Sequence, residues 1–239
     1  MVDVHSHVLF GIDDGAETIE DSLNILIRAE KAGIKKMIAT PHFSIGDEVD
    51  RFLQKRDAHF KELEKAVLDK GIEVELKCGA EVYITDEIYN EARLGELTLG
   101  NSNVLLSEFK YHGLKPETML DYVDEIMSHG LKVLIAHPER YSYLRNRMLV
   151  NALVSRGVLF QVNAISLFEE NEEGDFARML VRCGVASIIG SDIHHVPSGR
   201  MDAVKILVKN HEIDEIMFDN PDLIFENSKE LDNIEAELL

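Results

Sequence analysis

The chain of 239 residues is poor in several features, and each shortage excludes a class of protein. Two cysteines, Cys78 and Cys183, are too few for a disulfide framework, and their spacing does not fit a zinc knuckle. No apolar run approaches the roughly 18 residues of a membrane span. The first residues lack a basic region followed by an apolar stretch, so we expect no signal peptide. A reduced, cytoplasmic setting fits these absences best.

Positive charge is also scarce. The chain has 25 Lys and Arg residues against 44 Asp and Glu residues, which gives a formal net charge of -19 at pH 7. A general nucleic-acid binder needs a basic footprint, so we expect no nucleic-acid partner. A phosphorylated substrate is not excluded, because bound metal ions can reverse the sign of the charge in a local site.

The sequence is rich in short β-forming runs that alternate with helical patterns. Helical patterns that end at a glycine, such as Gly33 and Gly71, followed by an apolar strand, are typical of β/α units. The predicted strands are residues 2–8, 36–40, 74–80, 104–109, 132–136, 158–162 and 186–190. The predicted helices are residues 17–32, 49–70, 115–129, 148–156 and 176–183, with a further acidic, amphipathic helix at 220–239.

Seven such units predict a parallel α/β architecture. A barrel is the simplest arrangement, and an open, doubly wound sheet is the competitor. With 45% hydrophobic residues the chain can bury a sizeable core. Because it contains no linker, low-complexity segment or fixed-period repeat, we expect residues 1–239 to form a single domain.

Ionisable side chains recur at the ends of the predicted strands. His5 and His7 are two residues apart on the first strand and therefore project from one face. The carboxyl ends of the strands converge on one mouth in a β/α barrel. Unpaired burial of these groups would cost on the order of several kcal/mol each, which divalent metals would offset. The remaining groups at strand ends are Asp13, Asp14, His42, Glu81, Glu108, His137, Glu139, Arg140, Asn163, Asp192, His194 and His195.

Each of these residues also has an ordinary structural interpretation, such as a turn, a helix cap or a loop histidine. Their recurrence at the same point of successive units favours metal binding. Imidazoles with carboxylates and no thiolate suit manganese, iron, zinc or magnesium, and they argue against a cysteine-rich structural zinc site. The other histidines fall in predicted helices or their connections, and we expect His59, His112, His129 and His211 to be surface residues.

Five short motifs contain most of these strand-end groups. They are Asp3-Val4-His5-Ser6-His7, Thr40-Pro41-His42, Gly79-Ala80-Glu81, Ala136-His137-Pro138-Glu139-Arg140 and Ser191-Asp192-Ile193-His194. Together they resemble the motifs of the PHP (polymerase and histidinol phosphatase) superfamily, and the resemblance covers essentially the whole chain. Within the superfamily the chain looks most like the bacterial manganese-dependent protein-tyrosine phosphatases of capsule and exopolysaccharide operons.

The resemblance implies a distorted seven-stranded (β/α)7 barrel with three divalent metal ions at its mouth. Manganese is the first choice, with iron, zinc, magnesium or cobalt as alternatives. Arg140 and Arg200 match the two arginines that hold substrate phosphate, and His194 or a metal-bound water would donate a proton. The implied ligands are His5, His7, Glu81 and Asp192 for one metal, Glu81, Glu108 and His137 for the second, and Asp14 (or Asp13), His42 and His194 for the third.

The implied function is hydrolysis of phosphotyrosine by metal-activated hydroxide. The implied substrate is the Tyr-rich tail of a bacterial tyrosine kinase, in the regulation of capsular or extracellular polysaccharide synthesis. Histidinol phosphatase, or another small-molecule phosphoesterase on the same scaffold, is the alternative. A non-catalytic regulatory binding module and a C–N hydrolase are rivals from other classes. The complete ligand set argues against the module, and the lack of a lysine at a strand end argues against the C–N hydrolase.

A cysteine mechanism can be tested on the sequence. A Cys-based phosphatase carries an arginine six positions after its nucleophile, in a loop that cradles phosphate. Here Ile84 follows Cys78 at that distance and Ile189 follows Cys183. The sequence therefore predicts that both cysteines are structural.

Overall fold

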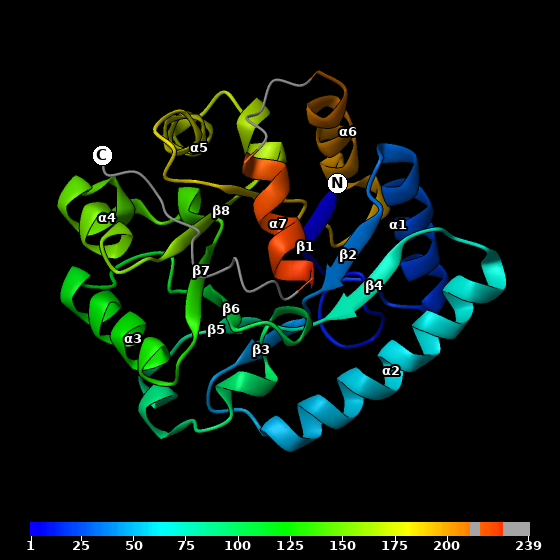
Figure 1. Ribbon diagram of the computed structural model, residues 1–239, viewed down its shortest axis with the longest axis horizontal. Coiled ribbons are helices and arrows are strands. Elements are labelled where there is room, and N and C mark those ends of the chain that lie inside the picture. Colours follow the sequence, from blue (N-terminus) through cyan, green and yellow to red (C-terminus); the bar gives the residue numbers. More distant parts are fainter. Residues whose placement is uncertain (211–215, 227–239) are drawn as a thin grey trace.

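Strands and helices alternate along the chain. The computed structural model of the protein describes residues 1–210 and 216–226 (Figure 1). The strands are β1 (Val2–Ser6), β2 (Lys36–Ala39), β3 (His42–Ser44), β4 (Glu75–Cys78), β5 (Glu81–Tyr83), β6 (Val104–Glu108), β7 (Lys132–Ala136), β8 (Leu159–Asn163) and β9 (Ile188–Gly190). The α-helices are α1 (Ile19–Ala32), α2 (Val49–Lys70), α3 (Pro116–Ser128), α4 (Arg147–Val154), α5 (Glu172–Arg182), α6 (Arg200–Asn210) and α7 (Ile216–Glu226). Short 3-10 helices are η1 (Asp86–Asn90), η2 (Leu94–Glu96), η3 (Leu99–Asn101), η4 (Pro138–Arg140), η5 (Ser142–Arg145), η6 (Ile165–Phe168) and η7 (Val196–Ser198).

The strands form two parallel sheets, in the orders β1-β2-β4 and β3-β5-β6-β7-β8-β9. The predicted parallel α/β class is therefore confirmed, but two short strands that were not predicted, β3 and β5, follow the predicted strands 36–40 and 74–80. Pro41 has no backbone N–H and separates β2 from β3. Gly79 separates β4 from β5 where the backbone of Thr98 presses close. The last strand also approaches the first, because Ser6 forms a parallel bridge with Ile193.

The predicted helices are present, with shifts that local hydrogen bonds explain. Thr18 and Asp21 form a capping box that starts α1, and the helix ends at Gly33 with φ 96°. Helix α5 begins at Glu172, four residues before its predicted start, because the side chain of Asn171 caps it. Of the predicted helix at 220–239, residues 220–226 belong to α7, and residues 227–239 lie outside the described residues.

Two apolar layers pack against the strands, one outside them and one among them. The larger layer lies between the strands and the outer helices, which surround the strands in Figure 1. The smaller layer lies among the strands and includes Val4, Leu106 and Leu134. Ile224 and Phe225 of α7 close this inner layer at the end where β1 begins. Polar groups are therefore left to gather at the opposite, carboxyl ends of the strands.

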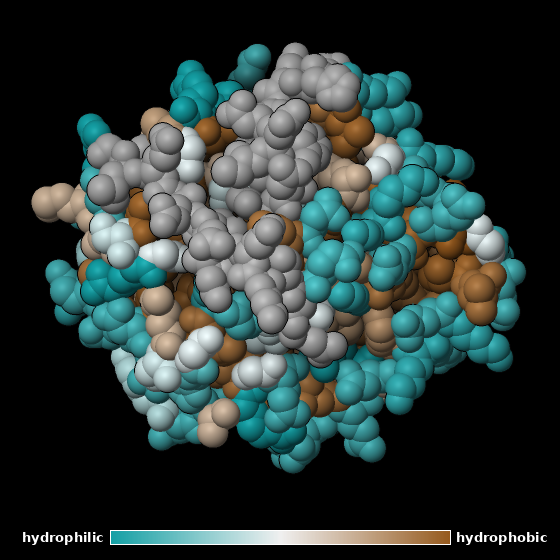
Figure 2. Space-filling view, in the orientation of Figure 1, coloured by the Kyte–Doolittle hydropathy of each residue, from teal (hydrophilic) through white to brown (hydrophobic). Residues whose placement is uncertain are grey.

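The outer surface is largely hydrophilic over the peripheral helices on the face shown in Figure 2. Apolar residues appear there mainly between helices. Within the described residues, no helix is long and apolar enough to cross a membrane.

Candidate metal centre

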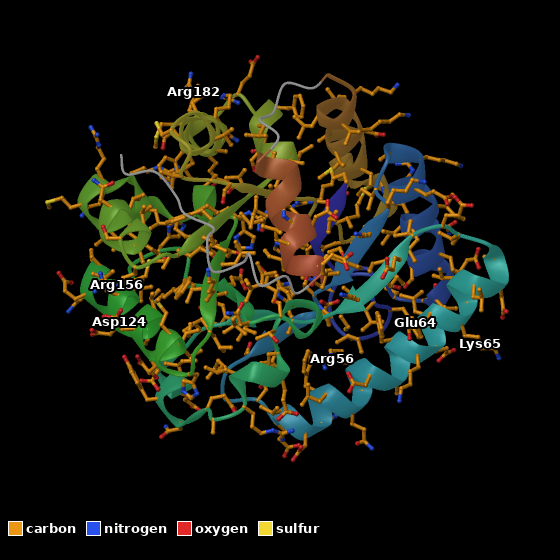
Figure 3. The ribbon with its side chains drawn as sticks, viewed as in Figure 1. Arg56, Glu64, Lys65, Asp124, Arg156 and Arg182 are labelled. Atoms are coloured by element: carbon orange, nitrogen blue, oxygen red, sulfur yellow. The ribbon has the colours of Figure 1, made fainter. Side chains whose placement is uncertain are left out.

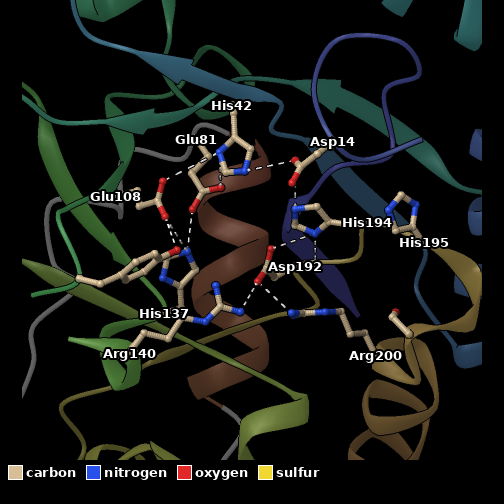
Figure 4. Close-up of a pocket in the computed structure, with 12 residues that line it drawn as sticks. Asp14, His42, Glu81, Glu108, His137, Arg140, Asp192, His194, His195 and Arg200 are labelled. Carbon is tan, nitrogen blue, oxygen red and sulfur yellow. Dashed lines mark hydrogen bonds and ion pairs between the residues drawn. The ribbon is translucent and has the colours of Figure 1, made fainter. Parts of the chain in front are cut away.

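The predicted ligands meet around one cavity of about 460 Å³ at the carboxyl ends of the strands (Figure 4). His5 and His7 are fully buried beside it. The cavity is lined by Asp14, His42, Glu81, Glu108, Tyr111, His137, Arg140, Asp192, His194, His195, Ser198 and Arg200.

A bulge in β1 contributes to this convergence. Asp3 pairs with Met37 but Ser6 pairs with Ala39, so β1 contains one more residue than β2 between these two pairs. A bulge of this kind re-aims a side chain. Val4 packs in the inner apolar layer, and its neighbour His5 reaches the carboxylate of Glu81.

The buried carboxylate of Glu81 is the centre of the cluster. Its Oε2 lies 3.2 Å from Nε2 of both His5 and His7 and 3.1 Å from Nδ1 of His42. Its Oε1 lies 2.8 Å from Nε2 of His137. Nevertheless Oε2 is buried and has no hydrogen-bond partner. A cation among these atoms would satisfy an oxygen that the protein alone leaves unsatisfied.

Asp192 joins the histidines to two arginines. Its Oδ1 lies 3.5 Å from Nε2 of His5 and 3.5 Å from Nδ1 of His194. Its Oδ2 accepts hydrogen bonds from Arg140 Nη2 and Arg200 Nη1, each at 3.0 Å. The same carboxylate therefore faces the candidate metal ligands with one oxygen and the predicted phosphate-binding side chains with the other.

Asp14 closes the cluster from the solvent side. Its Oδ1 lies 3.6 Å from Nε2 of both His42 and His194. The predicted third ligand set is thus brought together, with His7 alongside it. For the predicted second set, Glu108 Oε1 lies 3.9 Å from Nε2 of His137, but His42 also stands 4.0 Å from Glu108.

Electrostatics also favours positive charge in this place. Burial would raise the pKa of the Glu81 carboxyl, but the charge of His5 and the hydrogen bond from His137 outweigh burial and hold that pKa well below its usual range. Burial likewise opposes ionisation of Asp192, yet His5 and Arg200 contribute to a pKa well below normal. Both carboxylates are therefore ionised and available to a cation.

Asp13, the predicted alternative to Asp14 as a metal ligand, and Tyr111, which was not predicted as a site residue, both contact candidate ligands. Asp13 is not in any of the candidate metal groups; its Oδ2 accepts from His7 Nδ1 at 2.8 Å and from the His42 amide at 2.9 Å. Tyr111, in the loop after β6, donates its hydroxyl proton to Glu108. Their only sequence signal is their closeness to a strand end.

The four histidines expected at the surface differ in their exposure. His112 and His129 are exposed, as predicted. The prediction for His59 is wrong, because its ring is half-buried, stacks on Phe10 and hydrogen-bonds to the Phe10 carbonyl oxygen. His211 lies outside the described residues.

Fold and site together define an α/β protein with a candidate metal centre at the carboxyl ends of its parallel strands. The sequence matches the family described as capsular polysaccharide synthesis, CpsB/CapC, over residues 1–226. The chain belongs to this family.

Relatives agree with this assignment. YwqE of Bacillus subtilis, named a tyrosine-protein phosphatase, is 29% identical over 238 residues, which cover 95% of this chain and 92% of the relative. A solved structure reported with YwqE from Bacillus subtilis and CpsB from Streptococcus pneumoniae, described as metal-dependent tyrosine phosphatases, superposes with a TM-score of 0.80. That structure is 26% identical, and the match covers 96% of both chains. Dihydropyrimidinase from Brevibacillus agri, 11% identical with a TM-score of 0.55 over 100% of this chain and 72% of its own, shares the fold alone.

Proposed function

We propose that this chain is a metal-dependent protein-tyrosine phosphatase, a phosphoric monoester hydrolase. One observation carries the proposal: Arg140 and Arg200 converge on Asp192, whose other oxygen faces the histidine cluster. Paired guanidiniums are suited to bidentate recognition of phosphate. Their position beside a candidate metal centre fits an enzyme that binds a phosphate ester, and the named activity of the relatives supports the same conclusion.

The donor set fits divalent metal ions. Imidazole nitrogens and carboxylate oxygens without thiolate suit manganese, our first choice, as well as iron, zinc, magnesium or cobalt. We propose three ions. Their ligands would be His5, His7, Glu81 and Asp192; then Glu81, Glu108 and His137, with His42 close by; then Asp14, His42 and His194. When bound, such ions acidify water and withdraw charge from phosphate oxygens.

The protein's own side chains would orient the substrate. Arg140 and Arg200 are partly exposed at the cavity and would hold the equatorial phosphate oxygens while Asp192 fixes their position. Tyrosine has a pKa of about 10, so tyrosinate leaves without a strong general acid. His194 lines the cavity and is the side chain we propose for holding a proton near the leaving oxygen.

The remaining parts of the proposal concern the molecule and its setting. We propose a distorted barrel of seven units in which β2 with β3, and β4 with β5, each act as one strand; the Ser6–Ile193 bridge supports closure. We propose that residues 1–239 form one domain. The proposed substrate is a phosphotyrosyl protein, such as the Tyr-rich tail of a bacterial tyrosine kinase. The proposed location of the reaction is the cytoplasm. The capsular polysaccharide family supports that setting.

Steady-state kinetics of the manganese-loaded protein test the proposal. We expect kcat/KM for a phosphotyrosyl peptide to exceed clearly that for histidinol phosphate and for a phosphoseryl peptide. A preference for histidinol phosphate would instead assign a small-molecule phosphatase, and no turnover of any ester would favour a binding module.

A variant and its matched control sharpen this assay. Arg140→Ala should lower kcat/KM by about 10²–10³-fold, the typical loss of one preorganised charge-stabilising donor, and should weaken inhibition by inorganic phosphate. Arg156→Ala is the control, because Arg156, in the turn after α4, pairs with Asp124 of α3 and neither residue lines the cavity (Figure 3). Equal kinetics for both variants would remove Arg140 from the phosphate site.

A further inference from the structure

A chain of buried side chains runs beneath the candidate metal centre, from His5 to Asp192. Its two middle members, Gln161 and Asn163, lie on β8 and point to the same side of that strand. His5 Nδ1 lies 2.7 Å from Gln161 Oε1, Gln161 Nε2 donates to Asn163 Oδ1 at 3.0 Å, and Asn163 Nδ2 donates to Asp192 Oδ2 at 2.8 Å. All four residues are 0–1% exposed, so water does not compete for these contacts.

The direction of this chain is fixed by its end at Asp192. A carboxylate oxygen held by two guanidiniums can only accept, so Asn163 must present its NH2 group there. The carbonyl of Asn163 then faces Gln161, which must donate in turn. The carbonyl of Gln161 accordingly faces His5, and Nδ1 of His5 must carry the proton.

Each link thus determines the next, and neither amide can flip without leaving two buried groups unsatisfied. At the His5 end, this order of donors and acceptors decides which ring nitrogen carries the proton. With its proton on Nδ1, neutral His5 has its lone pair on Nε2, the nitrogen that faces Glu81.

The backbone around the chain is shaped to admit it. A Cβ at Gly190 would lie 2.9 Å from Gln161 Nε2 and 2.9 Å from His5 Cβ, so no side chain fits between the two links. The backbone N–H of Asn163 donates to Glu139 Oε1 at 2.9 Å, which holds the end of β8 in place.

We propose that Gln161 and Asn163 form an amide relay that positions the site. The relay sets the tautomer of His5 for metal binding and the orientation of Asp192 for holding Arg140 and Arg200. It therefore ties the metal side of the cavity to its phosphate side. Its effect on catalysis rests on the proposed function, but the tautomer and the affinities for metal and phosphate do not require turnover.

The tautomer is tested on the unmodified protein. Long-range 1H–15N spectra of the metal-free chain, recorded at a pH where His5 is neutral, should show the His5 proton on Nδ1. A His5 proton on Nε2 would overturn the relay, whether or not the protein is a phosphatase. Because no substitution is involved, the result does not depend on how any variant folds.

Asn163→Asp tests the coupling. It keeps the size of the side chain but replaces the NH2 donor with an acceptor. We expect the manganese dissociation constant to rise about 10- to 100-fold, as for other residues that orient metal ligands, and inhibition by inorganic phosphate to weaken in the same variant. Asn163→Leu, which removes the donor without adding charge, should shift both constants in the same direction.

Asn90→Asp is the control for added charge, because Asn90 is exposed on the surface. Circular dichroism establishes that the variants compared are folded. If folded Asn163 variants bind manganese and phosphate as the wild-type protein does, the relay has only a packing role and the inference is wrong. Intact binding constants together with no ester hydrolysis in the wild type would instead contradict the proposed function alone.

Discussion

Two candidate ligands have a positive backbone φ, which residues other than glycine rarely adopt. His137 has φ 33° and Asp192 has φ 51°, and within the described residues they alone have positive φ without being glycine. A non-glycine residue in this region costs on the order of 1–3 kcal/mol, and such residues cluster at functional sites. The strain at His137 and Asp192 therefore agrees with the roles proposed for them. It is invisible in the sequence, where both residues simply follow a strand.

A first prediction concerns Cys78. Burial raises the pKa of its thiol from about 9 to about 12. The neutral thiol is thus favoured by the folded state, so this contribution to stability is complete below pH about 9 and is lost as the pH rises toward about 12. We expect iodoacetamide at pH 8 to label Cys78 far more slowly in the folded protein than in urea.

Enzyme kinetics test the same conclusion, that the cysteines take no part in catalysis. Cys78→Ser with Cys183→Ser should leave kcat/KM nearly unchanged, because neither thiol lines the cavity. Complete loss of turnover in a folded double variant would refute a mechanism without a cysteine nucleophile.

For single residues, the sequence predicted that the side chains directly after strands lie close together, because the carboxyl ends of parallel strands meet at one edge. It could not predict the partners of those residues. Asp13 and Asp14 are adjacent carboxylates in one loop, yet Asp13 turns inward to His7 while the Asp14 side chain is 73% exposed. Gln161 and Asn163 act through the direction of their amides, which depends on Asp192 far along the chain.

Among the connections between elements, the loop between β1 and α1 packs closely against His7. A Cβ at Gly15 would lie 2.2 Å from the carbonyl oxygen of His7 and 2.6 Å from its Cβ. Both contacts are too short for any real side chain. The loop therefore needs glycine here to bring Asp13 and Asp14 over the histidines.

Gly15→Ala should accordingly displace this loop. We expect a loss of stability of about 1–3 kcal/mol, as for other overpacked positions, and weaker manganese binding. Gly95→Ala is the matched control, because nothing lies within 4 Å of a Cβ there and its φ is not positive. Thermal unfolding and metal titration of both variants measure the difference; equal behaviour would show that the loop yields without cost.

Helix and strand types were predictable because apolar periodicity and terminal glycines are local signals. Strands β3 and β5 were not predicted, because the predicted strands 36–40 and 74–80 end next to Pro41 and Gly79. A proline or a glycine also occurs at strand ends, and only the packing of Thr98 against Gly79 turns that residue into a break. The bulge in β1 likewise depends on its register with β2.

Across the whole molecule, the candidate metal centre should couple metal binding to the stability of the fold. A site that forms only in the folded chain stabilises it by about 2.7 kcal/mol when a metal ion is present at 100 times its dissociation constant. We expect EDTA to lower Tm and added manganese to restore it. Calorimetry with and without chelator measures the shift.

The double substitution His5→Ala with His7→Ala supplies the control. Both imidazoles lie 3.2 Å from Glu81 Oε2, so their loss should empty that metal position, abolish turnover and reduce the response of Tm to manganese. The protein should remain folded, because its apolar layers are untouched. An unchanged response to manganese would place the stabilising metal elsewhere.

The meeting of β1 and β9 has a consequence for biosynthesis. Ser6 finds its partner Ile193 only after nearly two hundred residues have been made, and Phe225 seals the inner apolar layer later still. A nascent chain on the ribosome therefore carries an open strand edge and an uncovered core through most of translation. Its period of greatest vulnerability to aggregation, and its need for chaperones, ends only as α7 leaves the exit tunnel.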